Sequence, residues 1–180
     1  YDQIKDIIKS KYLIDYDTTE KLLSMAHEIF DGILEVRLNT VWFWSFGMTD
    51  DYVFLRGMEK LMYDFIDEPE NVHKLMELLY RGTVEKLEFL ENSGLLCLNN
   101  DGTFVGSGGI GFTDELPAKN FTGHVRMKDM WGLGESQVTV GISPDMFEEF
   151  IVPAYKKIYG FYKANGVQLI VHHSDSYAAN

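Results

Sequence analysis

Apolar residues recur with a helical period in four stretches of the chain. Leucine, methionine, isoleucine and phenylalanine return every three or four positions over about residues 18–30, 51–66, 70–92 and 144–164. This spacing predicts four helices, each with one apolar face. Pro153 predicts a kink within the last of them.

Shorter apolar runs between these helices predict strands. They lie at about residues 33–46, 95–98, 134–140 and 167–171 and are rich in aromatic, β-branched or continuous apolar residues. A glycine-rich segment at about 102–131 has no clear period, and its length predicts an ordered functional loop such as a lid. Strands separated by whole helices pair in parallel through crossovers, so this order predicts an α/β protein.

Polar side chains follow several of the predicted strands. In α/β folds the loops after the carboxyl ends of strands hold the chemistry. Asp101, Glu135 and His172 occupy such positions, and we expect them to be the catalytic residues. A substrate is expected to contact Trp44, Tyr52, Gln137, His173 and Asp175.

Each candidate also has a plainer interpretation. Successive strand residues point to opposite faces, so one of His172 and His173 would face the site as an acid, base or metal ligand, and the other would pack. Asp101 stands in an Asn-Asp-Gly sequence that is ordinary turn chemistry. Glu135 is harder to explain structurally, because a carboxylate in a strand-like segment is costly unless it is paired or used.

Composition narrows the class of protein. Hydrophobic residues make up 46% of the 180 residues and charged residues 24%, which is typical of an ordered globular domain. The net charge of -12 repels phosphate backbones and argues against nucleic-acid binding. The single cysteine, Cys97, excludes an internal disulfide in this stretch. Apolar runs fall short of the ~20 residues of a membrane span, and we expect a cytoplasmic protein.

Four segments resemble the uroporphyrinogen decarboxylase superfamily: FLRGME (54–59), DEPE (67–70), GISPDMFEEFIVP (141–153) and GVQLIVH (166–172). The resemblance implies a (β/α)₈ TIM barrel. A complete barrel takes ~250 residues, so residues 1–180 would be the central part of a single barrel domain. The start at Tyr1 without a methionine agrees with that expectation.

The superfamily includes zinc-dependent methyltransferases that move methyl groups between corrinoid proteins and thiols. The resemblance therefore implies a methyltransferase acting with a corrinoid protein or a methylated small molecule. His172 matches a zinc ligand of these enzymes, and Glu135 would assist it. The position of their cysteine ligand is Ser174 in this chain, and serine is a poor ligand for zinc.

Two alternatives remain open at this point. One is uroporphyrinogen decarboxylase itself, in which Asp101 or Asp175 would stabilise a protonated pyrrole and Tyr52 would lie near the substrate. The arginine-rich motif that holds the tetrapyrrole carboxylates is not found in the N-terminal part of the chain. The other alternative is a corrinoid- or tetrapyrrole-binding protein without catalytic activity.

Overall fold

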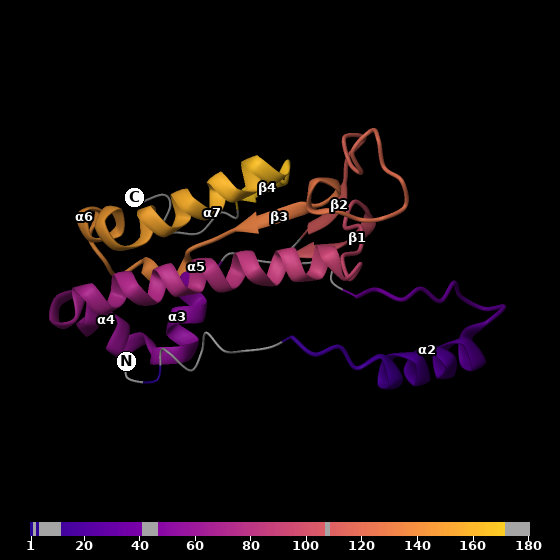
Figure 1. Cartoon of the computed structure of the whole chain (residues 1–180), viewed down its shortest axis with the longest axis horizontal. Coiled ribbons are helices and arrows are strands. Elements are labelled where there is room, and N and C mark those ends of the chain that lie inside the picture. Colours follow the sequence, from indigo (N-terminus) through magenta and orange to yellow (C-terminus); the bar gives the residue numbers. More distant parts are fainter. Residues whose placement is uncertain (2, 4–11, 41–46, 107–108, 172–180) are drawn as a thin grey trace.

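The computed structural model describes residues 1, 3, 12–40, 47–106 and 109–171 (Figure 1). Most of these residues are helical. The helices are α2 (Tyr16–Phe30), α3 (Met48–Arg56), α4 (Met58–Asp67), α5 (Pro69–Asn92), α6 (Pro144–Met146) and α7 (Val152–Asn165), with the π-helical η3 (Phe147–Ile151) and the 3₁₀ helices η1 (Met127–Asp129) and η2 (Gln137–Thr139). The strands are β1 (Asp101–Gly106), β2 (Gly109–Phe112), β3 (Trp131–Gly134) and β4 (Gln168–Val171).

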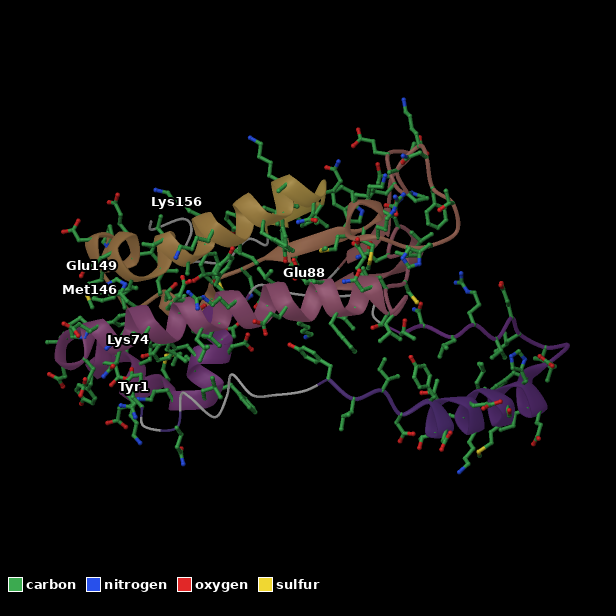
Figure 2. The ribbon with its side chains drawn as sticks, viewed as in Figure 1. Tyr1, Lys74, Glu88, Met146, Glu149 and Lys156 are labelled. Carbon is green, nitrogen blue, oxygen red and sulfur yellow. The ribbon has the colours of Figure 1, made fainter. Side chains whose placement is uncertain are left out.

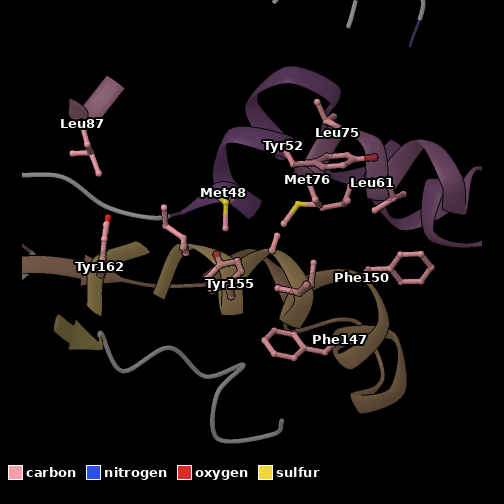
Figure 3. Packing of buried hydrophobic residues seen from close by; sticks show 14 of the residues in the cluster. Met48, Tyr52, Leu61, Leu75, Met76, Leu87, Phe147, Phe150, Tyr155 and Tyr162 are labelled. Atoms are coloured by element: carbon pink, nitrogen blue, oxygen red, sulfur yellow. The ribbon is translucent and has the colours of Figure 1, made fainter. Parts of the chain in front are cut away.

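The long helix α5 organises the core. It contacts α3 and α4 as well as η3 and α7, and Figure 1 shows it running between the α3–α4 pair and α7. Figure 3 shows the side chains that fill this space. They include Met48, Tyr52, Leu61, Val72, Leu75, Met76, Leu87, Phe150, Ile151, Ile158 and Tyr162. Burying this apolar surface is the main favourable contribution to folding.

The parallel pair β3–β4 confirms one crossover predicted from the sequence, but its first strand was misplaced: β3 spans Trp131–Gly134, and the predicted strand over 134–140 contains the 3₁₀ helix η2 instead. Trp131 pairs with Gln168 and Gly134 with Val171, so both strands end at the same edge. The chain between them passes through η2, α6, η3 and α7. The π-helical segment lies directly before Pro153, where proline removes a backbone donor from the helix.

The expected (β/α)₈ barrel is wrong for the part of the chain that the structure describes. There the strands form two separate two-stranded sheets, one parallel (β3–β4) and one antiparallel (β1–β2). Helices account for most of the residues. The structure is therefore a helical assembly with one β–α–β unit.

The structure differs from the expected barrel partly because the described residues of two predicted strands do not form strands. Residues 33–40 have no regular secondary structure, and residues 41–46 lie outside the described part. Residues 95–98 contain only an isolated bridge at Leu96. The apolar composition of 95–98 indicated a buried strand, but a strand also needs a partner strand to bond its backbone groups. In the structure a side chain bonds one of these groups, since Thr40 Oγ1 donates to the Leu95 carbonyl.

The helix predicted over 51–66 is divided into α3 and α4 at Gly57. This residue has φ +90°, a conformation that favours glycine. The glycine-rich loop is also more regular than predicted, since it contains the β1–β2 hairpin. None of the helices in the described part is long and apolar enough to cross a membrane.

Candidate functional site

The residue that follows β3 lies against the first turn of α3. Glu135 comes directly after Gly134 at the carboxyl end of β3, and the next element, η2, contacts α3. Val171, the last residue of β4, is paired with Gly134. The carboxyl edge of the parallel pair therefore meets a helix N-terminus, an arrangement that favours binding of small molecules.

Buried hydroxyl groups hold this edge in place. The Tyr155 hydroxyl donates to the Glu135 carbonyl at 2.6 Å and lies 3.4 Å from Thr49 Oγ1. Thr49 Oγ1 lies 3.4 Å from Ser136 Oγ, which in turn is 3.0 Å from Thr139 Oγ1. The network joins α3, η2 and α7, so it fixes the backbone that carries Glu135.

Two carboxylates interact at this edge. Burial raises the pKa of Asp50, and the negative charges of Glu135 and Asp51 raise it further. Asp50 lies in the first turn of α3, and its carboxylate lies close to Gly47. A Cβ at residue 47 would lie 2.7 Å from Asp50 Oδ2, so glycine leaves room for this carboxylate.

This arrangement has two chemical capabilities. Two carboxylates whose charges repel one another bind a cation favourably, because the cation relieves the repulsion. A carboxyl group with a raised pKa also keeps its proton to higher pH and can act as a general acid. Asp50 and Glu135 together therefore form the candidate site, which we call the acidic edge.

The structure separates several residues that the sequence placed together. Glu135 is half-buried at the acidic edge, and Gln137 is exposed at the start of η2 nearby. Asp101 begins β1, and its neighbour Asn99 bonds to Trp131 at the opposite end of β3. Asp101 is therefore not brought to Glu135.

Tyr52 lies in a different cluster. It is completely buried, and its hydroxyl group bonds to the hydroxyl of Tyr1 and, at 3.4 Å, to Asp64 Oδ2. Burial and the neighbouring acidic groups raise the pKa of Tyr52 far above its ordinary value. These contacts give Tyr52 a structural role in the α3–α4 packing.

Four predicted site residues lie outside the described part of the chain: Trp44, His172, His173 and Asp175. Within residues 1, 3, 12–40, 47–106 and 109–171, no group of three or more histidine, cysteine, aspartate or glutamate side chains could hold a metal ion. The oxygen ligands of the acidic edge differ from the nitrogen and sulfur ligands that zinc prefers. Zinc binding by His172 with Glu135 stays a prediction.

Sequence reasoning missed Asp50, Thr49 and Tyr155. Asp50 and Asp51 lie in the first turn of α3, where negative charges complement the helix start, so nothing local distinguishes them from ordinary helix-start residues. Tyr155 follows the apolar pattern of its helix and is in fact buried. Only the contact between α3 and η2, together with the bond from the Tyr155 hydroxyl to the Glu135 carbonyl, shows that these residues lie around Glu135.

Comparison with known proteins found no matching family model, no matching curated protein and no matching solved structure. The similarity to the uroporphyrinogen decarboxylase superfamily therefore rests on the four sequence segments alone. Across the residues that the structure describes, the fold and site define a mainly helical protein in which a β–α–β unit ends in an acidic edge.

Proposed function

We propose that this protein is a methyltransferase that binds a cationic or methylated small molecule at the acidic edge. The observation that carries the proposal is the placing of Asp50 beside the charge of Glu135 where β3 ends. Methylated ammonium and sulfonium compounds are compact cations, and they complement such a pair. The sequence segments shared with the superfamily support the same activity.

Aromatic rings at the edge support binding of a methylated cation. The rings of Tyr155 and Tyr159 meet edge to face, with centroids 5.9 Å apart. The Tyr159 hydroxyl would lie 2.9 Å from a Cβ at Gly134, so this ring closes over the end of β3. Aromatic faces attract cations, including quaternary ammonium groups.

The residues of this chain would bind the cation and donate one proton to the leaving amine. Methyl transfer breaks the bond between carbon and nitrogen, and its electron pair stays on nitrogen as the cation becomes a neutral amine. Glu135 would hold the cation before transfer. Asp50, whose raised pKa favours its protonated form, would give its proton to the amine as the carbon–nitrogen bond breaks, and would regain a proton from water before the next turnover. A corrinoid carried by a partner protein would supply the nucleophile when bound.

Binding is tested first, without any methyl acceptor. Tetramethylammonium titrated calorimetrically into the full chain should bind, and Glu135→Gln should weaken binding by about tenfold, the effect of removing one charge near a cation. The control is Glu88→Gln, an exposed glutamate on α5 (Figure 2) that changes the net charge equally. Equal effects of both substitutions, or no binding by the wild type, would contradict the proposal.

Catalysis is tested with free cob(I)alamin as methyl acceptor and methylated amines as donors, following methylcobalamin by its absorbance. Asp50→Asn should bind the cation and lower the transfer rate, because the proton donor is lost. Uroporphyrinogen decarboxylation at an enzymatic rate would overturn the proposal in favour of a decarboxylase. Binding without turnover of any donor would favour a binding protein.

A further inference from the structure

Helix α2 has an apolar face that nothing in the described structure covers. None of its residues is buried, and Leu22 and Ile29 expose 60% and 59% of their surface. Figure 1 shows the helix apart from the rest of the molecule. Leu22, Met25, Ile29 and Phe30 share one side of the helix by their spacing.

The segments on either side of α2 contact the rest of the molecule. The segment before α2 contacts α5, and the segment after α2 contacts the residues that follow α5. The ring of Tyr12 stacks on Phe89 with centroids 5.1 Å apart, and its hydroxyl donates to the Gly82 carbonyl at 3.4 Å. On the other side, the Thr40 amide donates to Cys97 Sγ at 3.3 Å. Residues 13–39, which we call the α2 arm, therefore project from two fixed points.

The α2 arm needs a partner for stability. Its helix has a local N-cap, in which the Asp15 side chain accepts from the Thr18 amide at 3.0 Å and so satisfies one backbone donor of the first turn. An isolated helix of about 15 residues is nevertheless marginal in water, since helices gain most of their stability by packing an apolar face. The exposed face of α2 is therefore incomplete by itself.

Exposed apolar side chains also lie on the neighbouring helices α3 and α4. Phe54 and Ile66 expose 91% and 75% of their surface. We define the α3–α4 patch as Phe54, Leu55, Met58, Tyr63 and Ile66, all of them exposed. Figure 1 shows α3 and α4 at the opposite end of the molecule from α2, so the two apolar surfaces do not cover one another.

We propose that the α2 arm of one copy docks on the α3–α4 patch of a second copy, and that the second arm docks in return. Such a reciprocal pair has two-fold symmetry and closes on itself, so both kinds of apolar surface are covered. A foreign partner for the arm would leave the patch exposed, and exposed patches of this kind favour association. This proposal is independent of the proposed function.

The surface available is large enough. The exposed large apolar side chains of the arm are Leu13, Tyr16, Leu22, Met25, Ile29, Phe30, Ile33, Leu34 and Leu38. Two reciprocal contacts that each cover about half of this surface would bury on the order of 1,500–2,000 Å² in total, the range of stable interfaces. Each copy carries a charge of -12, so the copies repel and association must depend on apolar contact.

The first test measures oligomeric state by analytical ultracentrifugation of the full chain up to about 100 μM, a range that detects weak dimers. We expect a dimer that tightens with added salt, because salt screens the repulsion. The double variant Leu22→Glu, Ile29→Glu should have a dimer affinity at least about thirtyfold lower. The double variant Phe54→Glu, Ile66→Glu should lower the dimer affinity by a similar factor. Ser24→Glu and Lys60→Glu, at exposed positions outside these apolar sets, are the matched controls and should leave it unchanged.

The second test mixes the two double variants. In the mixture one arm and one patch remain intact, so a heterodimer should form that neither variant forms alone. A contact between two arms would give no such rescue. A monomeric wild type, dimers that resist the arm substitutions, or absence of rescue between variants with native circular dichroism would each overturn the proposal.

Discussion

Arg56 and Asp64 form a two-pronged ion pair that closes the turn between α3 and α4. Arg56 Nε lies 2.7 Å from Asp64 Oδ2, and Nη2 lies 3.0 Å from Oδ1. The Asp64 side chain is 5% exposed and also accepts from the Tyr1 hydroxyl at 2.5 Å. The Arg-Gly pair of the FLRGME segment thus has a structural purpose here, since Arg56 holds the turn that Gly57 permits.

Replacing Arg56 with alanine should destabilise the protein by about 2–4 kcal/mol, because it leaves a buried carboxylate without its cation. Arg81→Ala is the matched control. Arg81 pairs with Glu77 at 2.9 Å on the surface of α5, and exposed pairs of this kind contribute about 0–1 kcal/mol. Urea unfolding of the two variants measures the difference, and equal losses would show that burial of Asp64 is unimportant.

Asp50→Asn should stabilise the protein at neutral pH. The pKa of Asp50 is raised by burial and by Glu135 and Asp51, so the folded protein holds this proton more tightly than the unfolded chain. The wild type therefore loses stability as pH rises from the unfolded pKa of about 3.9 through the higher folded pKa. Below about pH 3 the carboxyl is protonated in both states, and the effect is absent.

Thermal unfolding of wild type and Asp50→Asn between about pH 3 and 8 checks this expectation. The melting temperature of the variant should exceed that of the wild type increasingly as pH rises. Asp51→Asn is a partial control, since Asp51 also has a raised pKa but Lys86 opposes the shift. A variant that is less stable than the wild type at pH 7 would show that the helix-start role of Asp50 dominates.

The sequence predicted helices better than strands, for a physical reason. The periods over 70–92 and 144–164 correspond to α5 and to the α6–η3–α7 run, because a helix satisfies its backbone within itself. A strand needs a partner strand, and the apolar pattern at 33–40 does not indicate which segment would pair with it. The helix predicted over 18–30 with one apolar face is also present, but α2 buries none of its residues.

The candidate site was predictable only in part. Glu135 was identified because a carboxylate inside the strand predicted over 134–140 requires an explanation, whereas the structure places it directly after β3. Its partner Asp50 precedes it by 85 positions and reaches it only through packing of α3 against η2. No local pattern encodes that contact, because α3 and η2 are far apart in the sequence and meet only in the folded chain.

Two glycines near the start of β4 should respond oppositely to alanine. Gly166 ends α7 with φ +70°, and a Cβ there would lie 3.2 Å from Lys128 Cβ, so Gly166→Ala should cost about 1–2 kcal/mol. Gly160 is inside α7, and a Cβ there would meet nothing within 4 Å. Gly160→Ala should stabilise by about 0.5–1 kcal/mol. Chemical denaturation of both variants provides the test, and a loss at both positions would contradict it.

Tyr155→Phe should loosen the acidic edge while leaving the core packed. The substitution removes the 2.6 Å bond to the Glu135 carbonyl and a partner of Thr49. Both lie in a buried network, so the expected cost is about 1–2 kcal/mol. Tyr63→Phe, whose hydroxyl is on an exposed residue of α4, is the control and should be near neutral.

The same variant separates positioning from simple stability. If Tyr155 positions Glu135, Tyr155→Phe should weaken tetramethylammonium binding several-fold at temperatures where the variant is fully folded. Tyr155→Phe would then resemble Glu135→Gln in binding, although the charge is retained. Unchanged affinity together with the loss of stability would restrict Tyr155 to a structural role and would show that the Glu135 carboxylate is positioned by other contacts.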